Sequence, residues 1–158
     1  MTSQSKLADN ELRIVRTFAA PPAVVFALWS NAEHMKRWMG PKAFTCPEAS
    51  IDFRVGGSYR GMIRSAANGD SWFSGVYREI VPNKRLVFTF TWDNEGPSAG
   101  IETLVTITFE EHDGNTIQTF HQAPFRTVER RDSHVGGWNQ AFDKQQAYAE
   151  IIAKEQTS

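Results

Sequence analysis

Consecutive β-type segments in the middle of the chain are the feature that most restricts its fold. They cover residues 44–55, 58–65, 71–80, 85–92, 102–111 and 116–122. Short, turn-forming connections separate them, for example Gly56-Gly57, residues 93–100 and Asp113-Gly114-Asn115. Such connections join antiparallel neighbours, because a parallel pair needs a crossover of about a dozen residues or more. We therefore expect one antiparallel sheet.

One more strand and two short helices precede this region. Residues 11–18 alternate between apolar and polar side chains, which is typical of a strand, and Pro21-Pro22 ends it. Apolar residues then recur at helical spacing from Val24 to Trp29. Asn31 is a suitable cap for a second helix, which we expect to end within residues 38–41.

The last part of the chain has a helical period. Its apolar stripe steps by three or four residues through Val135, Trp138, Phe142, Gln145, Ala149 and Ile152. A helix over residues 127–154 would be about 42 Å long. We expect an α+β fold, in which a curved sheet of six or seven antiparallel strands wraps around this long C-terminal helix. The domain should cover residues 11–154, after a disordered tail over residues 1–10.

Aromatic residues are frequent in a chain that is polar on average. It contains 11 Phe, 5 Trp and 3 Tyr, although its mean hydropathy is only −0.43. These rings either fill a core or line a cavity. Strand alternation puts Phe88, Phe90 and Trp92 on the sheet face that should meet Trp138 of the helix.

Charge and targeting signals exclude some partners. A formal charge of −1 gives no basic field for nucleic acid or for an anionic membrane surface. Cys46 is the only cysteine, so no intrachain disulfide forms, and we interpret it as a structural thiol. The first residues lack the pattern of a secretory signal, and no apolar run has the length of a membrane span. We expect a cytoplasmic protein.

A series of motifs along the chain resembles a known family. They are Ala20-Pro21-Pro22, Val25–Trp29, Arg37–Pro41, Asp52–Arg60, Gly75–Pro82, Arg85–Trp92, Val105–Phe109 and His134–Trp138. Over about residues 11–153 they resemble the bacterial proteins related to the heat-shock-protein-90 ATPase activator domain, which belong to the START-like (SRPBCC) superfamily. The resemblance implies the helix-grip fold.

The resemblance also implies a hydrophobic ligand in a cavity between the sheet and the C-terminal helix. Some members of the superfamily are cyclases or other enzymes, and the eukaryotic namesake assists a chaperone. This chain departs from the family at Gln145, because the family usually has leucine-rich positions in this helix. A buried amide needs a partner, which suggests a wetter or more selective cavity.

We therefore expect a binding module for a small hydrophobic molecule, aromatic or lipid-like. The candidate ligand-binding residues are Trp38, Phe53, Tyr59, Phe73, Tyr77, Phe88, Phe90, Trp92, Thr119, His121, Trp138, Phe142 and Gln145. The strand over residues 116–122 leaves its orientation open, because either Ile117, Thr119 and His121 or the alternate residues can face inward. We interpret His134 as one end of the cavity.

Two alternatives stay open. A cyclase- or hydrolase-type enzyme would use the same cavity, with His121 as its only candidate base. A chaperone-associated stress-response protein, implied by resemblance alone, would expose an apolar patch.

No nucleophile motif or metal-ligand spacing is visible, so we expect no cofactor and no metal. A homodimer is compatible with the sequence. The charged runs 110–113 and 129–132 are interpreted as solvated.

Overall fold

The computed structural model describes residues 7–93 and 101–157. Its elements are β1 (Leu12–Phe18), α1 (Pro22–Ser30), α2 (Ala32–Trp38), β2 (Thr45–Ile51), β3 (Ser58–Ser65), β4 (Gly69–Val81), β5 (Arg85–Trp92), β6 (Thr103–His112), β7 (Asn115–Ala123) and α3 (Val128–Thr157). This is the predicted order, and the element bounds differ from the predicted ones by a few residues.

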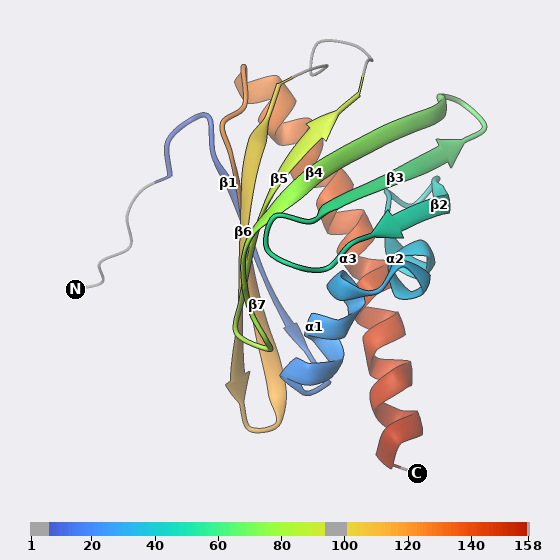
Figure 1. The fold of residues 1–158 in the computed structure, drawn as a ribbon, viewed down its shortest axis with the longest axis vertical. Helices are drawn as coiled ribbons and strands as arrows, with labels where there is room; N and C mark the ends of the chain where they lie inside the picture. The colour runs from blue at the N-terminus through green and yellow to red at the C-terminus, as the bar shows by residue number, and fades with distance from the viewer. Residues whose placement is uncertain (1–6, 94–100, 158) are drawn as a thin grey trace.

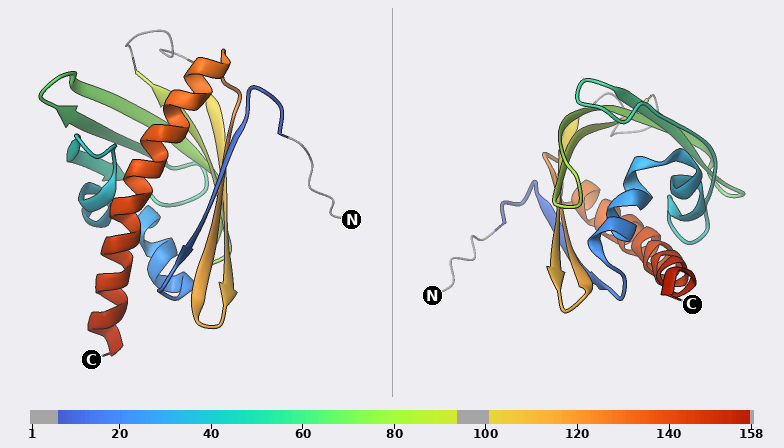
Figure 2. Two further views of the ribbon diagram at one scale, coloured as in Figure 1. Left: turned by 180° about the vertical axis from the view of Figure 1, so that it is seen from behind. Right: turned by 60° about the horizontal axis from the view of Figure 1, so that its bottom comes forward.

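The strands form one seven-stranded sheet in the order β1-β7-β6-β5-β4-β3-β2, and all its neighbours are antiparallel. From β2 to β7, each strand pairs with the next one along the chain, and β1 adds itself to the edge of β7. The sheet curls around α3, with α1 and α2 inside its concave side (Figures 1 and 2). The predicted helix-grip architecture is confirmed.

The two short helices begin and end where the sequence predicts. Pro22 is the first residue of α1, where its missing N–H costs no hydrogen bond. The side chain of Asn31 caps α2 by accepting hydrogen bonds from the backbone N–H groups of Glu33 and His34, at 2.8 and 3.2 Å.

Aromatic rings fill the space between the sheet and the C-terminal half of α3. Trp29 of α1 lies at its centre, with its ring centroid 4.7 Å from that of Trp38 and 6.2 Å from that of Phe142. Phe120 of β7 stacks on the same indole at 6.1 Å. Because these side chains are almost fully buried, this half of the molecule is a packed core.

Buried amides of β7 connect the sheet to this core. The indole N–H of Trp29 donates to Oε1 of Gln118 at 3.0 Å, and Nε2 of Gln118 donates to Oε1 of Gln145 at 3.2 Å. The indole N–H of Trp138 donates to Gln122 at 2.8 Å. The carbonyl oxygen of Gln145 thus has a partner, whereas its Nε2 has no hydrogen-bond partner among the described residues.

Two predicted irregular segments fall partly outside the described residues. Residues 1–6 of the predicted tail lie there, whereas the backbone oxygens of Asp9 and Asn10 accept hydrogen bonds from Arg131 and Phe125. The predicted turn over residues 93–100 lies outside the described residues except for Asp93. Among the described helices, none is both long and apolar enough to cross a membrane.

Candidate functional site

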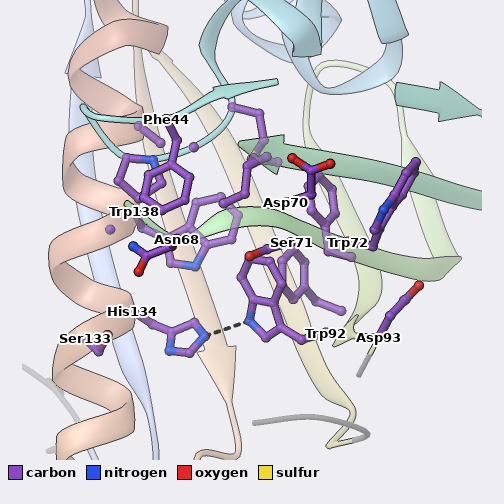
Figure 3. Close-up of a pocket in the computed structure, with 18 of the residues that line it drawn as sticks. Phe44, Asn68, Asp70, Ser71, Trp72, Trp92, Asp93, Ser133, His134 and Trp138 are labelled. Carbon is purple, nitrogen blue, oxygen red and sulfur yellow. Dashed lines mark hydrogen bonds between the residues drawn. The ribbon is translucent and has the colours of Figure 1, made fainter. Parts of the chain in front are cut away.

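A cavity of about 620 Å³ opens between the N-terminal half of α3 and strands β3, β4 and β5 (Figure 3). The segment between α2 and β2, including Pro41 and Phe44, borders it on a third side. A cavity of this volume accommodates a drug-sized molecule. The cavity and the rings packed around Trp29 thus occupy different parts of the space between the sheet and α3.

The cavity wall is aromatic. Its rings are those of Phe44, Trp72, Phe73, Phe90, Trp92 and Trp138. Phe73 stacks on Phe90 with ring centroids 5.4 Å apart, and Phe90 meets Trp138 edge-on at 5.7 Å. Gly61, which pairs with Phe73 across β3 and β4, leaves room for this ring, since a Cβ at Gly61 would lie 2.5 Å from its Cζ. The wall is thus built from rings that support one another.

One face of α3 supplies the opposite wall. Its residues recur at helical spacing: Arg130, Ser133, His134, Gly137, Trp138 and Ala141. Gly137 leaves space here, and a Cβ added to it would meet only the Cγ of Pro41, at 3.5 Å. The polar residues of this face lie toward the helix N-terminus and the apolar ones toward its middle.

His134 joins the helix wall to the sheet wall. Its Nδ1 lies 2.8 Å from the carbonyl oxygen of Arg130, which can only accept, so Nδ1 carries the hydrogen. Its Nε2 then accepts the indole N–H of Trp92 at 3.1 Å (Figure 3). Burial lowers the pKa of His134 below the ordinary value of 6.5. The geometry therefore requires a neutral imidazole.

The acidic groups at the cavity are paired. Arg64 holds Asp70 through two hydrogen bonds, at 2.7 and 3.2 Å, and this pairing lowers the pKa of Asp70. Arg60 forms an ion pair with Asp93 at 2.7 Å, while its guanidinium lies 4.3 Å from the ring centroid of Trp72. Each carboxylate thus has its own arginine.

Four of the predicted ligand-binding residues meet in the cavity: Phe73, Phe90, Trp92 and Trp138. His134 lies at the cavity as predicted. Trp38, Phe142 and Gln145 are buried in the packed half instead. Phe53, Tyr59, Tyr77 and Phe88 form an aromatic cluster outside the cavity, with centroid distances of 5.0–5.5 Å between neighbouring rings. Tyr59 connects this cluster to Phe73 of the cavity wall at 6.3 Å.

The prediction that placed Thr119 and His121 in the cavity needs correction. The inward residues of β7 are Thr116, Gln118, Phe120 and Gln122, so Thr119 and His121 lie on the outer face. There Nε2 of His121 lies 2.8 Å from a carboxylate oxygen of Glu11. The enzyme alternative thereby loses the only base that it had.

Sequence reasoning missed part of the helix wall. The charged run 129–132 predicts a solvated side chain at Arg130, but this residue is half-buried and lines the cavity. Stepping back from Trp138 by four residues gives His134 and then Arg130, so the helical period itself carries the signal. Gly40, Asn68 and Ser71 were also missed as lining residues.

Several residues outside the cavity have structural roles or are exposed. Cys46 is buried, and burial raises the pKa of its thiol to about 11. Asp52 and Arg54 form an exposed ion pair at 3.0 Å. Residues 110–113 are exposed as predicted. Within residues 7–93 and 101–157, no group of three or more His, Cys, Asp or Glu side chains could hold a metal ion.

Comparison with known proteins gives a family match over most of the chain. The model of a family described as activator of Hsp90 ATPase homolog 1-like protein matches residues 19–150. A search of curated proteins found no match.

Several solved structures have the same fold. A protein from Chromobacterium violaceum is 26% identical, with a TM-score of 0.77, and the match covers 89% of this chain and 98% of that one. The AHSA1 protein from Silicibacter pomeroyi is 22% identical, with a TM-score of 0.78 and coverage of 90% and 99%. A Nitrosomonas europaea protein is 21% identical, with a TM-score of 0.77 and coverage of 94% and 99%.

Proposed function

This chain belongs to the family of activator of Hsp90 ATPase homolog 1-like proteins, and from that premise we propose that it binds a small, ring-bearing apolar molecule in the cavity beside α3. The observation that carries the proposal is the aromatic wall of Phe73, Phe90, Trp92 and Trp138 around about 620 Å³. Most other aromatic side chains of the protein pack closely against one another, whereas these four surround an open cavity. Such a wall suits a flat apolar ligand, which can stack on rings.

The energetics favour binding through surface burial. Each Å² of apolar surface removed from water contributes about 25 cal/mol. A ligand that buries about 200 Å² would therefore gain about 5 kcal/mol before the costs of association are subtracted. The stacked rings of Phe73 and Phe90 and the hydrogen bond between Trp92 and His134 hold part of the wall in place beforehand. Less ordering entropy is then lost on binding.

Binding is better supported than catalysis. His121, the base on which the enzyme alternative depended, lies on the outer face of the sheet. His134 does line the cavity, but both of its ring nitrogens are engaged, one with Arg130 and one with Trp92. A general base needs a free nitrogen within hydrogen-bond reach of its substrate.

A neutral fluorescent probe tests the proposal. N-phenyl-1-naphthylamine should bind the wild-type protein with saturable enhancement of its fluorescence. Gly137→Leu should weaken this binding, because its side chain occupies part of the cavity beside α3. Gly136→Leu is the matched control, because no atom lies within 4 Å of a Cβ at that position.

Thermal melts of both variants establish that they are folded. The proposal fails if the wild-type protein shows no saturable binding. It also fails if a folded Gly137→Leu variant binds the probe as tightly as Gly136→Leu does.

A further inference from the structure

We propose that the ligand carries a carboxylate, which Arg130 binds at the N-terminal end of α3. This inference rests on the proposed binding of an apolar molecule in the same cavity. It adds the chemical class of that molecule, an apolar carboxylic acid with an aromatic ring system, and the direction in which it lies.

The charge balance of the cavity carries the argument. Asp70 and Asp93 line it, but Arg64 and Arg60 neutralise them at 2.7 Å each. Arg130 lines it as well, and its guanidinium has no hydrogen-bond or ion-pair partner among the residues that the structure describes. Only its backbone is engaged, with Thr127 and His134.

His134 and Arg131, the basic groups next to Arg130 on α3, do not share this property, and Arg126 does not line this cavity. His134 is held neutral by its two hydrogen bonds. Arg131, the next residue along α3, is paired with Asp132 at 3.0 Å and does not line the cavity. Among the described residues that line this cavity, Arg130 is therefore the one cation without a counter-charge.

The order of residues on α3 sets the direction of the ligand. Arg130 and Ser133 lie at the polar end of the helix wall, and Trp138 and Ala141 lie two to three turns further on. An amphipathic molecule would place its charged end at Arg130 and its rings against Trp138 and Phe90. Gly137, between these two ends, keeps the path open along the helix.

A carboxylate suits this group better than a neutral polar end does. The guanidinium is planar and offers parallel N–H donors that match the two oxygens of a carboxylate. Its charge also strengthens these hydrogen bonds, because the surrounding rings exclude part of the solvent. A cationic ligand would be repelled by the same group.

Two isosteric probes test the inference by titration calorimetry at pH 7. One is 2-naphthoate and the other is 2-naphthamide, which has the same rings and a similar shape but no charge. We expect the wild-type protein to bind naphthoate at least about tenfold more tightly, as a charge-assisted hydrogen bond provides. The cationic 2-naphthylmethylammonium should bind more weakly than the amide.

The residue is tested with Arg130→Gln. This variant should bind naphthoate and naphthamide with equal affinity while keeping the wild-type affinity for naphthamide. Arg131→Gln removes the same charge one residue away and should keep the wild-type preference. Thermal melts establish that both variants are folded.

The outcomes separate the inference from the proposed function. If the wild-type protein binds both naphthalene probes equally, or if Arg130→Gln keeps the preference for naphthoate, the inference is wrong while the binding function stands. If no naphthalene probe binds, both are overturned. The wild-type comparison decides the charge preference even if Arg130→Gln fails to fold.

Discussion

The two adjacent glycines in α3 allow a prediction that separates helix stability from cavity shape. Gly136 and Gly137 both lie inside the helix, where glycine costs about 1 kcal/mol relative to alanine. A Cβ at Gly136 would meet no atom within 4 Å, and one at Gly137 would meet Pro41 at an ordinary contact distance of 3.5 Å. Neither substitution should therefore introduce strain.

We expect Gly136→Ala and Gly137→Ala to raise the free energy of unfolding by similar amounts, about 0.5–1 kcal/mol each. For a chain of this size, that change corresponds to an increase in Tm of about 1–4 °C. Urea unfolding followed by far-UV circular dichroism measures the free energy directly, and the slope with urea concentration should stay constant.

Ligand binding should distinguish the two variants. Gly137→Ala adds a methyl group to the cavity wall, whereas Gly136→Ala adds one to an exposed surface. The affinity for N-phenyl-1-naphthylamine should therefore change only in Gly137→Ala. If Gly137→Ala destabilises the protein while Gly136→Ala stabilises it, the packing of α3 against Pro41 is tighter than described and the reasoning is refuted.

Two further predictions concern the groups that fix the cavity wall. Burial lowers the pKa of His134, so the unfolded chain binds its proton more readily, and stability should fall as the pH drops below 6.5. Unfolding free energies at pH 7.5 and pH 5.5 measure this fall, which should be smaller in His134→Gln; an equal fall would contradict it. Trp138→Phe should cost about 1–3 kcal/mol in chemical unfolding, because it leaves Oε1 of Gln122 without its donor. An unchanged unfolding midpoint would show that the hydrogen bond between Trp138 and Gln122 does not stabilise the protein.

The fold was largely predictable because its signals are local. Turn residues such as Gly56-Gly57 separate the strands, and Asn31 marks the start of α2. The stripe through Trp138 and Gln145 marks the inward face of α3. Each of these signals depends on a few neighbouring residues and on the period of a helix or strand.

The orientation of β7 was not predictable in this way. Its inward side chains include Gln118 and Gln122, which are almost fully buried, while Ile117 lies on the outer side. These amides are buried because they meet the indole N–H groups of Trp29 and Trp138. Such pairs join distant parts of the chain, so hydropathy along one strand does not reveal them.

The position of the cavity depends on tertiary packing too. The sequence predicted rings on the inner faces, but it did not show that Trp29 fills one half of the space beneath the sheet. This packing places Phe142 and Gln145 in the core and leaves Trp138 beside the cavity. It also makes Arg130 a cavity residue, although its neighbours in sequence, Glu129 and Arg131, are charged.

The hydrogen bonds of α3 are distributed unevenly over the sheet. Side chains of α3 are bonded to Arg16 of β1, to Gln118 and Gln122 of β7, and to Trp92 at the end of β5. Among the described residues, no such bond connects α3 to β2, β3 or β4. The hairpin of β3 and β4 therefore faces the helix across the cavity without a hydrogen bond to it. Hydrogen bonds thus fix α3 directly against β1, β7 and the end of β5, whereas the distance of the β3–β4 wall from α3 is set through neighbouring strands of the sheet.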